Sequence, residues 1–147
     1  MNRRNLPYLL FGAALLSVGS AAVLPGSARA ADEKPYKVEN GRVNINTFHG
    51  YLFYGESCLR CHGPDGSGSS YAPSLVDSLK TLSKRQFQET VINGKQDVSQ
   101  ASTEVMPAFG TVADVLEHLD DIYAYLKARS DGALGRGRPK RIGESND

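Results

Sequence analysis

The sequence is poor in the residue types that usually build metal sites and disulfides. Its 147 residues include two cysteines, two methionines and three histidines. The cysteines stand only three positions apart, at 58 and 61, and no other cysteine competes with them for a disulfide partner. Alternating strand patterns are nearly absent and no internal repeat is found, so we expect an all-α fold. The candidate ligands for a metal or cofactor are therefore few enough to weigh one by one.

The sequence also has no large excess of positive or negative charge. The chain carries 17 basic and 16 acidic residues. Without residues 1–30, which hold three arginines and no acidic residue, the count is 14 basic and 16 acidic. Residues 135–147 carry a net charge of +2, and residues 31–134 carry a net charge of −4. An acidic body with a basic tail argues against nucleic acid as a partner.

Long apolar runs are confined to the N-terminus. Arg3 and Arg4 precede an apolar stretch at about 6–24, and Ala28-Arg29-Ala30 offers a small-residue cleavage site. This order predicts a signal peptide over residues 1–30 that is cleaved on export to the periplasm. The alternative is a retained membrane anchor, since a stretch of this length is borderline for crossing a bilayer. Cleavage would leave residues 31–147 as one domain without stable membrane insertion.

Both cysteines belong to the run Cys58-Leu59-Arg60-Cys61-His62. Two thiols at this spacing lie on one helical turn and can add to the two vinyl groups at one edge of a haem. The run therefore predicts one covalently bound haem c, with Cys58 and Cys61 forming the thioethers and His62 an axial iron ligand. The rival interpretation is a thioredoxin-type redox disulfide, which needs a βαβ context that the helical flanks do not offer.

The second axial ligand of the iron has few candidates. After signal removal Met106 is the one methionine left, 44 residues beyond His62 in a polar, proline-containing loop. We interpret it as an iron ligand rather than a core filler, and a His/Met pair raises the reduction potential. The other candidates are the lysines and His49 and His118, which we interpret as surface or boundary histidines. The His62 ring should donate its second N–H to a carbonyl, for which Pro73 is best placed.

Helix signals dominate the rest of the chain. Asn44 or Asn46 can cap a first helix that continues into the cysteine motif, and Ser83 with Gln86 forms a capping box for another. The last helix shows apolar residues at helical intervals from about 111 to 129. Elsewhere we expect an irregular arm or short hairpin over 31–43, a loop over 63–70, a short helix within 73–82, an irregular segment over 95–111 and a flexible basic tail over 131–147.

Taken together, these elements resemble the class I c-type cytochromes. Gly50, Tyr54 and Cys58 follow one another at spacings of four, and the last helix carries Ile122-Tyr123-Ala124-Tyr125. The resemblance covers residues 44–130 as the cytochrome domain and implies that its first and last helices cross around the haem. The residues that would form the crossing are Gly50, Tyr54, Ile122 and Tyr125.

The same resemblance implies roles at the iron. Pro73 matches the family proline whose carbonyl accepts the proton of the axial histidine, here His62. Met106-Pro107 matches the loop that supplies the second ligand.

A narrower resemblance is to the cytochromes that serve pyrroloquinoline-quinone (PQQ) alcohol dehydrogenases, which include those of methanol and ethanol oxidation. It rests on residues 36–38, 70–75, 120–129 and 135–139. It implies a periplasmic acceptor of single electrons from the quinoprotein dehydrogenase, with a downstream cytochrome or terminal oxidase as the next acceptor. We expect a monomeric electron-transfer protein rather than an enzyme.

Other functions stay open at this point. If Met106 does not ligate, the iron keeps an open position, as in a catalytic or gas-binding haem protein. The protein could also be a fixed subunit of a dehydrogenase or oxidase complex. The basic tail is either a solvated end or an arm that docks an acidic dehydrogenase surface.

Overall fold

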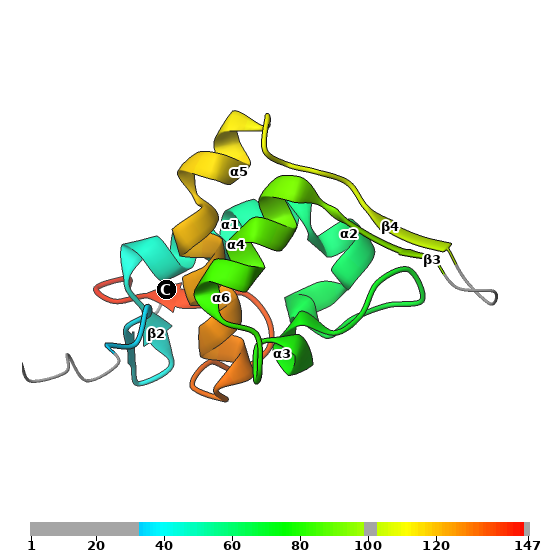
Figure 1. Ribbon diagram of the computed structural model, residues 1–147. Coiled ribbons are helices and arrows are strands. Elements are labelled where there is room, and N and C mark those ends of the chain that lie inside the picture. The colour runs from blue at the N-terminus through cyan, green and yellow to red at the C-terminus, as the bar shows by residue number, and fades with distance from the viewer. Residues whose placement is uncertain (1–32, 99–102, 146–147) are drawn as a thin grey trace, which may run out of the picture. The chain divides into compact units, whose positions relative to one another are not determined.

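The structure is a computed structural model that describes residues 33–98 and 103–145 (Figure 1). The predicted signal peptide, residues 1–30, lies outside the described residues. The helices are α1 (Ile45–Ser57), α2 (Leu59–His62), the 3-10 turn η1 (Pro64–Gly66), α3 (Leu75–Ser78), α4 (Lys84–Asn93), α5 (Ala113–Glu117) and α6 (Leu119–Ser130). The strands are β1 (Val38–Glu39), β2 (Arg42–Val43), β3 (Lys95–Val98), β4 (Thr103–Met106) and β5 (Lys140–Arg141). No helix among the described residues is long and apolar enough to cross a membrane.

The core forms where α1 packs against α6. Gly50 lies against the α6 backbone, and a Cβ at this position would overlap the carbonyl oxygen of Asp121. One turn further along α1, Tyr54 packs against Tyr125 with 5.6 Å between the ring centroids. Both tyrosines and Ile122 are almost fully buried. The expected contact between the first and last helices is therefore present.

The helix starts agree with the sequence signals in position. Ser83 and Gln86 form the capping box of α4, because the Ser83 hydroxyl accepts from the Gln86 amide and the Gln86 side chain accepts from the Ser83 amide. Asn44 is the N-cap of α1, but its side chain does not bond to a helix amide. Its Oδ1 instead accepts from the Thr47 hydroxyl at 2.6 Å.

Two predicted helices are each divided in the structure. The first ends at Ser57, and α2 begins after Cys58, whose φ of −117° departs from helical values. The last divides at His118, with φ −106° and ψ 15°, into α5 and α6. Side-chain periodicity continues across both breaks, which is why the apolar pattern predicts unbroken helices.

The strands are where the all-α expectation is incomplete. The sequence predicts an irregular segment over 95–111, but β3 and β4 form an antiparallel hairpin that pairs Lys95 with Met106. The arm over 31–43 contains the hairpin β1–β2, one of the two expected forms. The segments 95–98 and 103–106 show no alternation of apolar and polar residues, so the sequence carries little signal for the hairpin.

The C-terminal segment differs from the expected flexible tail. Strand β5 pairs in parallel with β2, and the amide of Ile142 donates to the carbonyl of Val43 at 2.8 Å. Leu134 and Pro139 are buried. Their apolar surface and the backbone pairing hold residues 134–142 against the body. The Gly- and Arg-rich composition of this segment gives no indication of that packing.

Candidate haem site

The cysteine motif occupies a bend at the end of α1. Cys58 is the C-terminal cap of α1, and its amide still donates to the Tyr54 carbonyl at 2.9 Å. Cys61 follows on α2. Neither thiol forms a disulfide, and burial raises the pKa of the Cys58 thiol to about 11. Cys61 is exposed, so the motif presents one half-buried and one exposed thiol.

The imidazole of His62 is buried and oriented. The residue is 7% exposed, and Nδ1 lies 3.0 Å from the carbonyl oxygen of Pro73. Because a carbonyl only accepts, Nδ1 carries a proton in this contact, and Nε2 is the ring nitrogen that remains available to a metal. The proline ring stiffens the backbone that presents this carbonyl. The contact therefore orients the His62 ring with Nε2 away from Pro73; the assignment of His62 as an axial iron ligand stays a prediction.

The loop after the motif folds back on it. Gly63 ends α2 with φ 72°, a conformation that favours glycine, and a Cβ there would overlap the Gly68 carbonyl. The Gly68 amide donates to the His62 carbonyl at 2.8 Å. The buried hydroxyl of Tyr54 donates a short hydrogen bond to the Gly63 carbonyl. Burial raises the pKa of Tyr54 to about 12, so at neutral pH this hydroxyl keeps the proton it donates.

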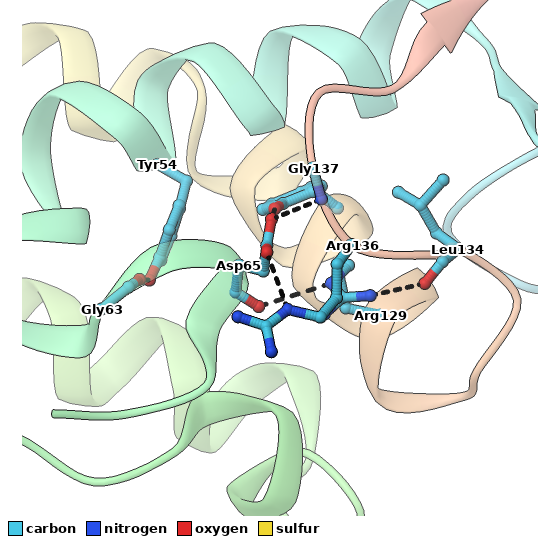
Figure 2. A network of polar contacts seen from close by, with 8 residues as sticks. Tyr54, Gly63, Asp65, Arg129, Leu134, Arg136 and Gly137 are labelled. Carbon is cyan, nitrogen blue, oxygen red and sulfur yellow. Dashed lines mark hydrogen bonds and ion pairs between the residues drawn. The ribbon is translucent and has the colours of Figure 1, made fainter.

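Asp65 joins this loop to the C-terminal segment (Figure 2). Its Oδ1 accepts from the Gly137 amide at 3.0 Å, and its Oδ2 pairs with Arg136 Nε at 3.3 Å. The Asp65 carbonyl accepts from Arg129 Nε at 3.4 Å, and Arg129 also donates to the Leu134 carbonyl at 2.7 Å. This network was not predicted from the sequence. The turn sequence Pro64-Asp65-Gly66 marks the bend, but the distant partners leave no local signal.

Met106 is the last residue of β4. It is half-buried and packs against the hydrophobic core. The segment after it is tied to the end of α4, because the amides of Phe109 and Gly110 donate to the carbonyls of Val91 and Ile92 at 3.0 Å. Gly94 permits this approach, since a Cβ there would lie 2.6 Å from the Met106 carbonyl oxygen. The Met106 thioether thus lies at the end of a hairpin that backbone hydrogen bonds join to α4. Its role as an iron ligand stays a prediction.

The two remaining histidines lie together at the helix crossing. His118 Nδ1 is 3.2 Å from Asp121 Oδ2, and His49 Nδ1 is 4.0 Å from the same oxygen. Phe53 stacks on the His118 ring with 3.7 Å between centroids. His118 is therefore more constrained than a residue of the solvent face.

A cavity of about 450 Å³ lies between α1 and the C-terminal segment. Tyr51, Tyr54, Tyr125 and Arg138 contribute to its lining. Leu59, which stands between the two cysteines, also lines it, whereas Cys58, Cys61, His62 and Met106 do not.

The donor set fits haem c. The motif supplies two thiols without a disulfide, His62 supplies an imidazole whose free nitrogen is defined by its Pro73 contact, and Met106 supplies a soft thioether. Exposed apolar side chains stand within the motif and beside Met106, namely Leu59 and Val105, and can meet an apolar ring edge or partner.

Comparison with known proteins also indicates a haem c protein. Residues 47–126 match the protein family described as cytochrome C oxidase, cbb3-type, subunit III. Cytochrome c-553I of Paracoccus denitrificans is 49% identical over 119 residues, which are 80% of this chain and 53% of that protein. Cytochrome c-555 of Methylococcus capsulatus is 41% identical over 96 residues, 65% of this chain and 72% of that protein.

A solved structure is similar as well. The crystal structure of the c-type cytochrome XoxG from Methylobacterium extorquens AM1 matches with a TM-score of 0.62 and 46% sequence identity. The match covers 68% of this chain and 60% of that one. The chain thus spans about half the length of cytochrome c-553I and somewhat more of XoxG.

Proposed function

Since the chain belongs to the c-type cytochromes and carries covalent haem c, we propose that it is a periplasmic one-electron carrier in alcohol oxidation. Haem c supplies a one-electron couple at its iron. Cys58 and Cys61 would hold the ring covalently, and His62 and Met106 would be the two protein ligands of its iron. A carrier of this kind changes no substrate bonds, so we assign it no catalytic residue.

The observation that carries this proposal is the fixed imidazole of His62. Its Nδ1 bond to the Pro73 carbonyl and its burial leave one nitrogen for the iron and keep the ring from turning. A hydrogen bond to a carbonyl also increases the basicity of the ligating nitrogen. A ligand held in this way would need little rearrangement during electron transfer.

Met106 decides between a carrier and an open-site haem protein. As a ligand, the Met106 thioether would exclude other molecules from the iron and would raise the reduction potential. The anchors of Phe109 and Gly110 on α4 support a fixed Met-Pro segment, because a mobile loop would release the ligand more often.

Met106→Ala tests the ligand. We expect the reduction potential to fall by at least about 59 mV, a tenfold change for a one-electron couple, and the Met–iron charge-transfer band to vanish. Val112→Ala is the control and should keep the wild-type potential and band, since Val112 is an exposed aliphatic residue outside the cysteine motif and strand β4. An unchanged potential and band in Met106→Ala would show that the second ligand is another residue.

We further propose that the donor is a PQQ-dependent alcohol dehydrogenase, with methanol or ethanol as its substrate, and that electrons pass to a downstream cytochrome or oxidase. The similarity to cytochrome XoxG and to cytochrome c-553I supports this placement. The exposed side chains of Arg136 and Arg138 give a candidate surface for an acidic dehydrogenase. Such transient complexes are small, at roughly under 1,200 Å² of buried surface.

A second candidate is a fixed subunit of an oxidase or dehydrogenase complex. The description of the matching family as an oxidase subunit favours it. Purification at high salt separates the two functions, since a diffusing carrier leaves its partners and a fixed subunit remains with them.

A further inference from the structure

We propose that His49, His118 and Asp121 form a second metal site, separate from the haem, that binds a divalent late transition-metal ion such as Zn²⁺. We call these three residues the imidazole–carboxylate cluster. The inference goes beyond electron transfer and does not depend on it. The chain has three histidines, and the two that lie outside the cysteine motif both belong to this cluster.

The geometry of the cluster is close to a coordination site. One ligand atom from each of the three residues lies within 4.8 Å of the others. Asp121 Oδ2 is 3.2 Å from His118 Nδ1 and 4.0 Å from His49 Nδ1. Around tetrahedral Zn²⁺, with bonds of about 2.0–2.1 Å, ligand atoms stand about 3.3 Å apart. One pair already has this spacing, and the others need small side-chain rotations.

The fold holds two of the three ligands in place. Asp121 lies on α6 where its carbonyl packs against Gly50, the residue after His49 on α1. This close approach sets the distance between the two helices at the cluster. The His118 ring is stacked on Phe53 at 3.7 Å with 12° between the ring planes, which fixes its orientation. A preorganised site of this kind loses little side-chain entropy on binding an ion.

His49 is the adjustable ligand. Its side chain is 40% exposed, whereas those of His118 and Asp121 are 20% and 17% exposed. It can rotate toward the carboxylate, and its exposure gives an ion a route from solvent. A water molecule can take the fourth position of a tetrahedral site.

The neighbouring carboxylate is engaged elsewhere. Asp120 pairs with Lys84 at 2.9 Å and accepts from Gln88 at 2.6 Å. Asp121 is thus the carboxylate directed at the imidazoles. Two imidazoles and one carboxylate favour Zn²⁺, Cu²⁺ or Ni²⁺ over Ca²⁺ and Mg²⁺, which prefer oxygen ligands.

A bound ion would bridge α1 and α6 beside their crossing. Binding to the folded state alone stabilises a protein by mass action. Since these helices form the core, the expected consequence is a more stable holoprotein.

Titration of the tag-free holocytochrome with ZnCl₂ tests the proposal. We expect one Zn²⁺ per molecule by calorimetry, a rise in melting temperature, and two imidazole ligands in the Zn K-edge absorption spectrum. His49→Gln keeps the size and exposure of the side chain, and it should weaken binding at least tenfold and remove one imidazole from the spectrum. Asp120→Asn is the matched control and should bind as the wild type does.

Two results would overturn the proposal. One is the absence of saturable Zn²⁺ binding to the wild-type holoprotein. The other is equal Zn²⁺ affinity in His49→Gln and wild type, which would place the ion elsewhere. The reduction potential of His49→Gln should equal that of the wild type, so the result is independent of the test of Met106.

Discussion

Gly50 shows how much one missing side chain determines in this molecule. A Cβ at this position would overlap the backbone carbonyl of Asp121, and a backbone atom cannot move aside as a flexible side chain does. We expect Gly50→Ala to lower the free energy of unfolding by roughly 2 kcal/mol or more, as overpacking at a close contact does. Denaturant unfolding of the ferrous holoprotein measures this.

Gly55 provides the control on the same helix. A Cβ there meets no atom within 4 Å. Gly55→Ala should therefore be neutral or stabilising by up to about 1 kcal/mol, because alanine has the higher helix propensity. Equal effects of the two substitutions would contradict the close crossing of α1 and α6.

The buried tyrosines give stability a pH dependence at the alkaline side. Burial raises the pKa of Tyr54 to about 12, and burial with the nearby Asp65 raises that of Tyr125 further. The unfolded chain loses each phenolic proton near pH 10, before the folded protein does. The stability contribution is therefore complete below about pH 10 and is lost as pH rises toward 12, by up to about 1.4 kcal/mol per pH unit for each tyrosine.

Tyr54→Phe separates this effect from other alkaline changes. It removes one of the two titrating groups, so we expect a shallower decline of the unfolding free energy between about pH 10 and 12. It also costs about 1 kcal/mol at neutral pH by removing the hydrogen bond to Gly63. Tyr71→Phe, at a 77% exposed position, should keep the wild-type slope. If the unfolding free energy of Tyr54→Phe fell with pH as steeply as that of the wild type, Tyr54 would not be a source of the alkaline loss of stability.

At the scale of elements, local signals were enough where one segment determines its own structure. The capping box of Ser83 and Gln86 begins α4, and apolar periodicity locates α1 and α6. The hairpin β3–β4 and the docking of β5 escaped prediction because their bonds join segments without an apolar pattern. The proximity of His49 to His118 escaped for a related reason, since it follows from the packing of α1 on α6.

The loop after the cysteine motif and the C-terminal segment depend on each other through Asp65. Asp65 has φ 60°, which asparagine tolerates as well as aspartate does, so Asp65→Asn removes charge without backbone strain. We expect a loss of about 1–2 kcal/mol, because Gly137 and Arg136 lose their anionic acceptor. Hydrogen exchange at the Gly137 amide should become faster.

Asp77→Asn is the control for this prediction. Asp77 is an exposed carboxylate paired with Lys80, and such solvent-screened pairs contribute little to stability. The Gly137 amide should exchange at the wild-type rate in this variant. Unchanged exchange in Asp65→Asn as well would mean that β5 and the buried Leu134 and Pro139 hold the segment without Asp65.

At the scale of the whole molecule, the net charge is small, but its two signs are separated along the chain. Residues 31–134 have a net charge of −4 and residues 135–147 a net charge of +2. Because β5 and Asp65 fix the C-terminal segment, its cations occupy defined positions instead of a wide volume. Arg138 lies over the Phe48 ring at 5.2 Å, which places its charge beside α1. A fixed basic surface can orient a partner as well as attract it.

Stopped-flow reduction of the ferric holoprotein by a reduced PQQ-dependent alcohol dehydrogenase from the same organism tests the central claim most directly. The account predicts fast, saturable reduction whose second-order rate falls as salt rises, because charged surfaces steer the encounter. Arg136→Gln should lower the rate at low salt and flatten the salt dependence. If the dehydrogenase does not reduce a protein whose haem is intact and reducible by ascorbate, the assignment of this donor is contradicted.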